Sequence, residues 1–386
     1  MMQLVLIEPD DVRGLWPFSA THGAWELRVG HGTILERWQR VLQGHPVVVT
    51  STRPLVEAGF HERQPGTCAA FAERPTLAIS ADVALTTTEM RRIIGFLGQT
   101  ACCITCNGVT VGVYLPTAFK TLDAMQAAID GLDVESVASV DVEGTVISSM
   151  WQVHDVMAKL IRDDAGYLDK HIHPTARVHQ MAVIDTRNGP VLIDAEAVVE
   201  PLAVIYGPAS IGRGCLVKAH SSLRTVALGP VCKVAGEIDT VVLQGYASKQ
   251  HDGFLGNAYL GEWTNLGAGT IASNLLNTYG NVIVNTPWGR LSTERMFVGL
   301  MMGDHSKTAI GTLFTTGTLV GVGANIVVSS FPPQLIRSFV WKDPSTPRPA
   351  LAKYLATARL VMQRRQQELG PAMTKLLTSI YVDGDA

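Results

Sequence analysis

Aliphatic residues recur every six positions along the second half of the chain. The spacing begins at Ile172, Val178 and Ile184 and resumes in a new phase at Ile193, Val199, Ile205, Ile211, Val217 and Leu223. The phase then slips and recovers: Leu228 and Val234 continue it, followed by Val242, Phe254, Leu260 and Leu266, with Ser248 in the intermediate position. A period of six fits neither the 3.6-residue turn of an α-helix nor the two-residue alternation of an amphipathic strand. It is typical of a solenoid in which each hexad forms one short strand and a turn, so that three hexads close a coil of about 18 residues.

Glycine directly follows many of these positions. Examples are Ile211-Gly212, Leu228-Gly229, Leu260-Gly261, Leu266-Gly267 and Val322-Gly323. A corner between two short strands favours small residues, because a bulky Cβ would clash there or force an unfavourable φ. We therefore expect a parallel β-helix of hexapeptide repeats over residues 172–342, with the aliphatic side chains stacked inside.

Two segments depart from the repeat. Residues 272–297 interrupt it with polar residues and Pro287-Trp288-Gly289, which indicates a loop that projects from a coil. Further on, Pro344, Pro347 and Pro349 mark a linker, and residues 350–381 carry apolar residues at helical spacing. This pattern predicts a C-terminal helical extension within residues 343–386, packed on the solenoid or on a neighbouring subunit.

The first 150 residues alternate differently. Residues 4–7, 46–50, 76–80 and 109–115 have the composition of buried strands, whereas residues 32–42 and 117–129 have a helical pattern. This alternation predicts an α/β layer over residues 1–150, joined to the solenoid by a connecting segment at residues 151–171. No Gly-Lys-Ser/Thr phosphate loop and no GxGxxG motif occurs in it, so this half suggests no function by itself.

Composition narrows the choice of partners. The 386 residues include 31 Lys+Arg and 34 Asp+Glu, with a formal net charge of −3 and no long basic block, which argues against nucleic acid. No apolar run approaches the roughly 18 residues of a membrane-spanning helix, and the N-terminus turns acidic early, so we expect a cytoplasmic protein without membrane contact. Of the six cysteines, Cys103 and Cys106 form one CxxC without a second, and we interpret them as buried strand residues rather than metal or redox groups.

The block from Ser248 to Thr270 reads SKQHDGFLGNAYLGEWTNLGAGT. It resembles the acetyltransferase half of the bacterial bifunctional family that makes UDP-N-acetylglucosamine, in which a pyrophosphorylase is joined to a glucosamine-1-phosphate acetyltransferase. The run FVGLMMGDHSKT at residues 297–308, residues 321–339 and Leu15-Trp16-Pro17-Phe18 are similar to a divergent branch of that family, described as sugar nucleotidyltransferase/acyltransferases. The resemblance is strong over residues 170–342 and weak over residues 50–150.

The resemblance implies a left-handed β-helix and a set of roles. His251 falls where the family has its catalytic base, 14 residues before Asn265 in an Asn-aliphatic-Gly-Ala-Gly motif, and imidazole suits proton removal near neutral pH. Glu237 falls on a glutamate near that base. Substrate contacts are implied at Asn265, with Arg224 and Lys249 as the nearest cations for a phosphate. The acyl-CoA contacts implied are Asn274, Ser273, Gly267, His305 and Lys307.

Several positions depart from the family pattern. Asp239 stands where the better-known enzymes have lysine, and Phe254 where they have tyrosine, which leaves the acceptor open. The Gly-rich triphosphate loop is absent, and His22 replaces an arginine of the divergent branch. Arg13, Arg28 and Asp82 remain as candidates for phosphate and Mg²⁺ binding. We therefore expect a reduced nucleotidyltransferase-like domain, with Mg²⁺ needed only if it is active.

These observations favour a homotrimeric, acyl-CoA-dependent acyltransferase, with acetyl-CoA as the expected donor. Its acceptor would be a sugar phosphate or nucleotide sugar. One alternative is a sugar-1-phosphate nucleotidyltransferase that forms a nucleotide sugar, and another is a non-catalytic nucleotide-sugar-binding module. A third, a zinc enzyme of the γ-carbonic anhydrase type, would need His220, His251 and His305 to converge across a subunit interface. We expect no resident metal.

Overall fold

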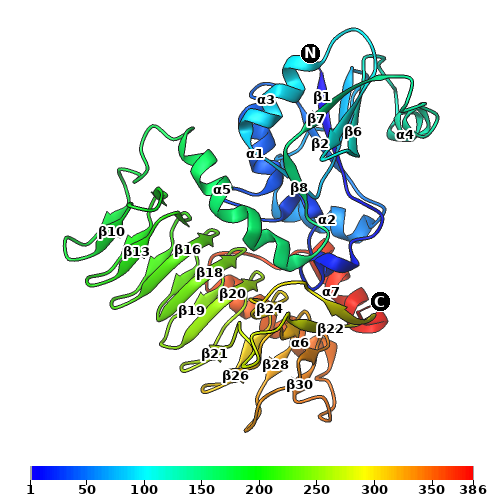
Figure 1. Ribbon diagram of the computed structural model, residues 1–386. Coiled ribbons are helices and arrows are strands. Elements are labelled where there is room, and N and C mark those ends of the chain that lie inside the picture. The colour runs from blue at the N-terminus through cyan, green and yellow to red at the C-terminus, as the bar shows by residue number, and fades with distance from the viewer. Residues whose placement is uncertain (1, 386) are drawn as a thin grey trace. The chain divides into compact units, whose positions relative to one another are not determined.

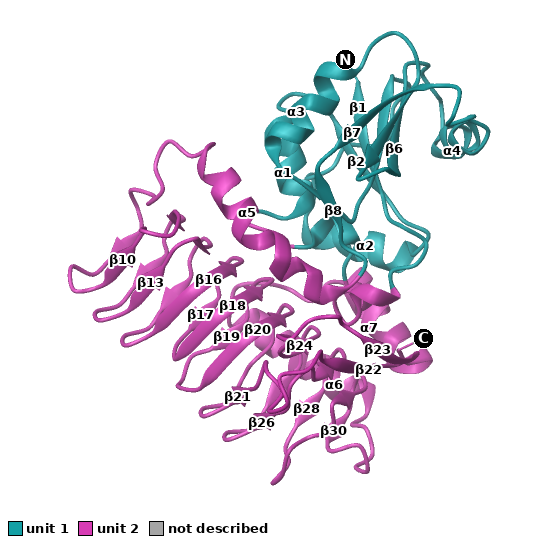
Figure 2. Cartoon of the chain, viewed as in Figure 1, with its two compact units in different colours: residues 1–12, 22–27, 32–148 teal, residues 13–21, 28–31, 149–386 magenta. Residues whose placement is uncertain are grey.

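The computed structural model describes residues 2–385, which divide into two compact units (Figure 2). Unit 1 comprises residues 1–12, 22–27 and 32–148, and unit 2 comprises residues 13–21, 28–31 and 149–386. The solenoid unit thus includes two short N-terminal segments in addition to the repeats.

Unit 1 contains a six-stranded mixed sheet in the order β2-β1-β3-β6-β5-β7. Its strands are β1 (Gln3–Ile7), β2 (Val47–Thr50), β3 (Thr76–Ser80), β5 (Cys102–Cys106), β6 (Val109–Leu115) and β7 (Ala138–Val142), beside the pair β4 (Val83–Leu85) and β8 (Gly144–Val146). Strand β1 pairs in parallel with β2 and β3, and β6 runs antiparallel to β3. The four strands that the sequence predicted are confirmed, as is a strand at Cys103 and Cys106 (β5), whereas β4, β7 and β8 were missed.

The helices of unit 1 are α1 (Ile34–Val41), α2 (Pro54–Arg63), α3 (Thr87–Phe96) and α4 (Leu122–Asp130), with the short turn η3 (Ala24–Glu26). Helix α1 begins at a reciprocal cap, because Glu36 N–H donates to Thr33 Oγ1 over 3.2 Å and Glu36 Oε2 accepts Thr33 N–H over 2.7 Å. Helix α4 begins at residue 122 rather than 117, since Thr121 caps it. Helices α2 and α3 were not predicted.

Strand β5 contains Cys102, Cys103 and Cys106, and all three thiols are buried and unoxidised. Burial raises the pKa of each thiol, which disfavours the reactive thiolate form. Their interpretation as small buried strand residues is confirmed.

Unit 2 is a β-helix of short parallel strands that lie side by side like rungs, preceded by helix α5 (Val153–Ala165), which packs on β14, β16 and β18 (Figure 1). The rungs are β9 (Arg177–Val178), β10 (Val183–Asp185), β11 (Val191–Ile193), β12 (Val198–Val199), β13 (Val204–Tyr206), β14 (Ala209–Ile211), β15 (Leu216–Val217), β16 (Ser222–Leu228), β17 (Lys233–Val234), β18 (Glu237–Leu243), β19 (Ser248–Lys249), β20 (Phe254–Leu260), β21 (Ile271–Ala272), β24 (Met301–Met302), β25 (Lys307–Thr308), β26 (Leu313–Phe314), β27 (Leu319–Val320), β28 (Asn325–Ile326), β29 (Leu335–Ile336) and β30 (Trp341–Lys342).

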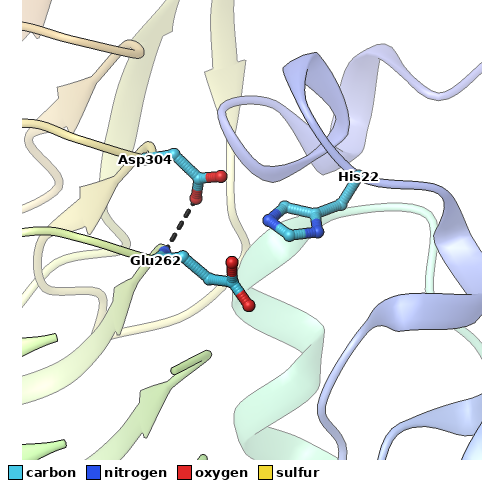
Figure 3. Close-up of side chains that lie close together, drawn as sticks. All are labelled: His22, Glu262 and Asp304. Atoms are coloured by element: carbon cyan, nitrogen blue, oxygen red, sulfur yellow. Dashed lines mark hydrogen bonds between the residues drawn. The ribbon is translucent and has the colours of Figure 1, made fainter. Parts of the chain in front are cut away.

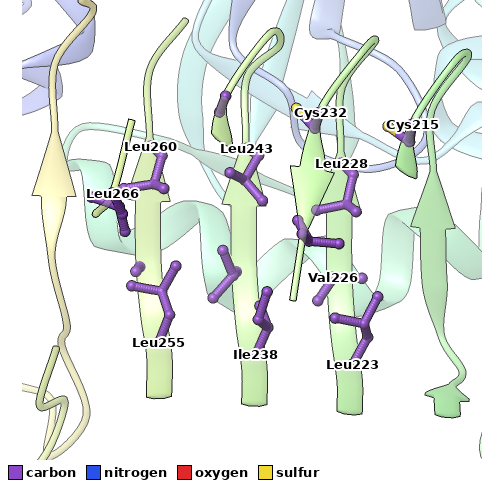
Figure 4. Packing of buried hydrophobic residues seen from close by; sticks show 14 of the residues in the cluster. Cys215, Leu223, Val226, Leu228, Cys232, Ile238, Leu243, Leu255, Leu260 and Leu266 are labelled. Atoms are coloured by element: carbon purple, nitrogen blue, oxygen red, sulfur yellow. The ribbon is translucent and has the colours of Figure 1, made fainter. Parts of the chain in front are cut away.

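The rungs stack in register, so that inward side chains form columns. Leu223, Ile238 and Leu255 follow one another in one column, and Leu228, Leu243 and Leu260 in a second (Figure 4). A third column contains Val199, Val217, Val234, Lys249, Leu266, Thr308 and Ile326. Close packing of these columns is the core of unit 2.

At three positions, the residue that points into the core of the β-helix differs from the sequence prediction. Val242, Ser248 and Phe254 were predicted to point inward, but the register places Leu243, Lys249 and Leu255 inside. The prediction failed because apolar residues occupy both phases of β18 and β20, and because a lysine is a poor candidate for an interior position.

The loop predicted at residues 272–297 contains a hairpin, in which β22 (Ile283–Thr286) pairs antiparallel with β23 (Gly289–Ser292). The C-terminal extension is two helices rather than one: α6 (Leu351–Gln363) and α7 (Pro371–Asp383). Pro371 stands at the first turn of α7, where its missing N–H is tolerated, and it could not continue α6.

The two N-terminal segments of unit 2 pack on its coils. Short turns η1 (Arg13–Leu15) and η2 (Phe18–Ala20) lie in the first segment, and the Phe18 ring meets the Tyr259 ring edge to face at 5.8 Å. In the second segment, His31 Nδ1 lies 2.9 Å from Ser210 Oγ. A further turn, η4 (Met150–Gln152), leads into α5.

Candidate active site on the β-helix

The candidate base His251 lies in the turn between β19 and β20, and its side chain is exposed. Gly253 ends this turn with φ +115°, and a Cβ there would lie 2.3 Å from Thr270 O, so the turn requires glycine. Glu237, at the start of β18, is exposed one coil away and donates its N–H to Gly253 O over 3.3 Å. The structure therefore brings the His251 turn and Glu237 to adjacent coils.

Lys249 is placed differently from its expected role. Its side chain is fully buried in the third column, and its ammonium donates to the carbonyls of His251 and Asp252. Burial lowers the pKa of Lys249 to about 8, partly opposed by the charge of Asp252. An ammonium that is held by backbone carbonyls inside the coil is not available to a phosphate.

Arg224 stands half-exposed between two neighbouring coils. Its guanidinium lies over the Tyr206 ring at 4.2 Å, and its Nε lies 3.7 Å from Asp239 Oδ2. Tyr206, Arg224 and Asp239 occupy equivalent positions of successive rungs. A carboxylate therefore lies next to the guanidinium that was expected to bind a phosphate.

Asn265 is exposed on the rung that follows Lys249, bridged to Ser248 on one side and Lys307 on the other. Gly267 lies two residues on, where its N–H donates to Thr308 Oγ1 over 2.9 Å and a Cβ would lie 2.6 Å from the Ala309 backbone. Glycine is therefore required at this position for a steric reason, in addition to being part of the motif that carries the resemblance.

Ser273 and Asn274 follow β21. Asn274 Nδ2 donates to Asn257 Oδ1 over 2.7 Å, and Ser273 Oγ lies 2.9 Å from Thr316 Oγ1 and donates to Leu275 O. Both side chains are thereby fixed, and both remain partly exposed.

His305 and Lys307 lie deeper than their expected role in acyl-CoA binding suggests. The buried His305 ring stacks on Trp263 at 6.2 Å and meets Tyr354 edge to face at 6.4 Å. Lys307 Nζ donates to His305 O over 2.8 Å, and burial lowers the pKa of Lys307 to about 8. His305 has φ +60° and thus serves as a corner residue of its coil.

Asp304 is a buried residue that the sequence did not single out. Its Oδ1 accepts the Glu262 N–H over 2.8 Å (Figure 3), and its Oδ2 accepts the Thr21 hydroxyl over 2.9 Å. A Cβ at Gly261 would lie 2.3 Å from Asp304 Oδ1. This carboxylate thus fixes the corner that precedes His305. In the sequence, the only indication of its role was its place directly before His305 in the GDHSK run.

In unit 1, a cavity of about 570 Å³ opens at the carboxyl ends of β1 and β2 and is lined by residues that include Glu8, Asp10, Ser51, Asp123 and Asp130. This is the edge at which parallel α/β sheets bind ligands. Four of these lining residues are acidic, which disfavours an unaccompanied phosphate.

Two arginines of unit 1 are paired with carboxylates, and one of these carboxylates, Glu8, lines the cavity. Arg53 Nε donates to Glu8 Oε2 over 2.9 Å, and Arg63 Nη2 donates to Glu26 Oε1 over 2.7 Å. Burial acts to raise the pKa of Glu26, but the charges of Arg63 and His22 outweigh it and hold that pKa at about 2. These pairs leave the two guanidinium charges neutralised.

Two other expected phosphate or metal ligands are also engaged. Asp82 is buried, accepts the Ser80 hydroxyl over 2.6 Å, and has a pKa raised by burial. Arg28 belongs to unit 2, where its Nη1 donates to His31 O over 2.8 Å and its Nε to Gln244 O over 3.4 Å. Arg28 therefore has a structural role within the β-helix unit.

The alternative of a zinc site of the γ-carbonic anhydrase type finds no support within a single chain. Within residues 2–385, the side chains of His220, His251 and His305 do not gather into a metal-ligand group. No helix in the same range is long and apolar enough to cross a membrane.

Comparison with known proteins is consistent with this architecture. Residues 4–172 match the family model described as sugar nucleotidyl transferase. A bifunctional sugar-1-phosphate nucleotidylyltransferase/acetyltransferase of Sulfurisphaera tokodaii is 31% identical over 88 residues, which cover 23% of this chain and 22% of that protein. The bifunctional protein GlmU of Anaplasma marginale (strain Florida) is 29% identical over 122 residues, covering 31% of this chain and 24% of that protein.

Among solved structures, the acetyltransferase domain of PglB from Neisseria gonorrhoeae matches 89% of this chain and 99% of that domain at 12% identity, with a TM-score of 0.21. The strand ladder of unit 2 itself defines the β-helix. The aligned regions span less than a quarter of the length of the curated relatives.

An α/β nucleotidyltransferase-like unit followed by a hexapeptide β-helix defines the class of this protein. More particularly, parts of the chain are similar to GlmU-like bifunctional nucleotidyltransferase/acetyltransferases, in line with the sequence resemblance.

Proposed function

We propose that this protein is an acyl-CoA-dependent acyltransferase that acts on a sugar phosphate or nucleotide sugar, with His251 as general base. The observation that carries the proposal is the exposed His251 in a glycine-dependent turn, with Glu237 and Asn265 on the adjacent coils. An imidazole that is exposed to solvent can reach a bound substrate and exchange a proton with it.

The reaction needs no covalent enzyme intermediate. The acceptor's amine or hydroxyl attacks the thioester carbonyl, a C–N or C–O bond forms, and the C–S bond breaks. His251 takes the acceptor proton and can return it to the departing CoA thiolate, so protons balance over one turnover. Asn265 would orient the acceptor, and Asn274 and Ser273 lie on the following coil, where the resemblance places acyl-CoA.

The test is turnover with acetyl-CoA and a panel of amino-sugar phosphates and nucleotide sugars, followed by release of free CoA thiol. His251→Ala should lower kcat by about 10²–10⁴-fold, the usual contribution of a positioned base, and leave acetyl-CoA affinity nearly unchanged. The control is His179→Ala, an exposed histidine of another coil. Equal turnover in all three proteins would remove His251 from the mechanism.

We further propose that the active unit is a homotrimer. Phe254, Ile271 and Leu313 follow one another on the outer surface of successive coils, and Ile271 and Leu313 are 41% and 40% exposed. An apolar strip beside the candidate base favours a neighbouring copy as its cover. The cleft between copies would then hold acceptor and donor.

Nucleotidyl transfer is the second candidate, favoured by the family match over residues 4–172 and by the cavity at the ends of β1 and β2. Mg²⁺ would supply charge neutralisation of a triphosphate there. The lining does not fit a magnesium triphosphate well, because phosphate ligands such as Lys or Arg are absent from the described residues that line this cavity and Glu8 is already paired with Arg53. We therefore derive no step through it. Release of pyrophosphate from UTP or dTTP with a sugar-1-phosphate would establish this activity, and its absence with intact acyl transfer would leave unit 1 in a non-catalytic role.

A further inference from the structure

Lys249 occupies an interior position that is otherwise suited to an aliphatic residue. In its column, Val234 precedes it and Leu266 follows it, and its own side chain is fully buried. A leucine or methionine could fill the same volume without removing an ammonium from water. Burial of an ammonium is unfavourable unless partners replace its hydration. Packing alone therefore does not explain this lysine.

The partners of the ammonium are all backbone carbonyls. Lys249 Nζ lies 2.5 Å from His251 O, 2.7 Å from Asp252 O and 3.5 Å from Ala235 O. An ammonium has three N–H donors, and these three acceptors account for them. The lysine thus connects the inside of the coil to one turn.

That turn is the one that presents His251. Two of the three acceptors are the carbonyls of His251 and its neighbour Asp252, which hold the backbone inward while the His251 side chain is exposed. We propose that Lys249 is the positioning residue for His251, acting through these carbonyls and not by contact with substrate. The inference rests on the proposed function for its consequence in turnover, but its structural part stands independently.

Two amide groups report on the turn. Ala235 N–H donates to Lys249 O over 2.7 Å, and Glu237 N–H donates to Gly253 O over 3.3 Å, so both amides bond to the residues that flank His251 and Asp252. Lys233 N–H, on the same coil, donates to Ala247 O over 2.9 Å outside the turn. Hydrogen exchange of these amides therefore separates a loosened turn from a loosened coil.

The first experiment measures hydrogen exchange by mass spectrometry on the full chain, comparing the native protein with Lys249→Met. We expect exchange at Glu237 to rise at least tenfold and exchange at Lys233 to change less than twofold. The matched control is Leu266→Met, which places methionine in the same column without removing a charge and should leave Glu237 protected. Unchanged exchange at Glu237 in Lys249→Met would overturn the proposal.

The second experiment measures turnover with acetyl-CoA and the acceptor found for the native protein. Lys249→Met should lower kcat at least tenfold with KM for acetyl-CoA within twofold, since the base is displaced and the donor site is kept. A rise in KM at constant kcat would overturn a positioning role. If the native protein itself transfers no acyl group, the proposed function fails, and the exchange result still decides whether Lys249 holds the turn.

A second variant covers the case in which Lys249→Met does not fold. Lys249→Gln keeps two N–H donors but is shorter and uncharged, so it should also expose the Glu237 amide, whereas Lys249→Arg keeps the charge and donors and should retain more protection than Lys249→Gln. Equal protection in the Gln and Arg variants would contradict a role for the ammonium.

Discussion

At the scale of single residues, His154 on α5 shows how burial sets a protonation state. Its Nε2 lies 3.1 Å from Ala258 O, and burial lowers its pKa to about 4, partly opposed by that carbonyl. The neutral ring is therefore the folded form, with its proton placed on Nε2 by the hydrogen bond.

We expect unit 2 to lose stability as pH falls. His154 is protonated near pH 6.5 in the unfolded chain and near pH 4 in the folded chain. The free energy of unfolding is therefore highest above pH 6.5 and falls as the pH drops towards 4, by on the order of 3 kcal/mol. Urea unfolding at pH 7 and pH 4.5 measures it. His154→Gln should reduce the difference in the free energy of unfolding between the two pH values, whereas His173→Gln, at an exposed position, should not. An equal difference in both variants would contradict this account.

The buried pair of Glu26 and Arg63 gives a second prediction at this scale. Removing one partner leaves an uncompensated charge, so Arg63→Met should lower the free energy of unfolding by about 3–5 kcal/mol at pH 7. Because the folded pKa of Glu26 is about 2, this stabilisation is present above pH 4.5 and is lost as pH falls towards 2.

The control for Arg63 is Arg92→Met. Arg92 is 54% exposed and lies 3.4 Å from Glu89, so this exposed pair should contribute less than about 1 kcal/mol. Denaturant unfolding of both variants at pH 7 compares them, and losses of similar size would show that burial does not govern the Glu26 pair.

At the scale of elements, one corner of the β-helix determines how α6 docks. Tyr246, Trp263, His305 and Phe339 all have positive φ, with stacked or edge-to-face contacts along the corner. Gly323 interrupts this aromatic row at φ +67°, and a Cβ there would lie 2.8 Å from the Tyr354 ring. Tyr354 of α6 therefore inserts at the position that the glycine leaves open.

We expect Tyr354→Ala to release α6 from the coil and to lower the free energy of unfolding by about 3–5 kcal/mol, the range for loss of a buried aromatic ring. Limited trypsin digestion should then cleave after Lys353 or Arg359 in the variant before the native protein is cut there. The matched control is Leu360→Ala, because Leu360 lies on the same helix and is 64% exposed. Native-like resistance in Tyr354→Ala would mean that other contacts hold α6.

At the scale of the whole molecule, the exposed apolar strip leads to a prediction about assembly. Light scattering should give a mass three times the 41.5 kDa of one chain. Ile271→Asp should reduce that mass by placing a charge in the strip, whereas Val109→Asp, at a 61% exposed position of unit 1, should not. A monomeric native protein would contradict the proposed trimer and with it an active site shared between copies.

The sequence by itself determined the periodic core, the four main strands of unit 1, the buried cysteines and the candidate base. These features depend on local pattern: a six-residue period permits only a solenoid, and a histidine in the SKQHDGF block is recognisable without coordinates. The same local pattern could not choose between adjacent phases in β18 and β20, since both phases carry apolar side chains.

Only the tertiary structure decided which residues lie inside and what they hold. Stacking in register assigned Lys249, and not Ser248, to the interior column, because the neighbouring rungs fix the phase of each short strand. Packing across long sequence separations likewise brought residues 13–21 and 28–31 into the β-helix unit and paired Arg224 with Asp239. Such contacts depend on the position of distant chain segments, which no local spacing in the sequence encodes.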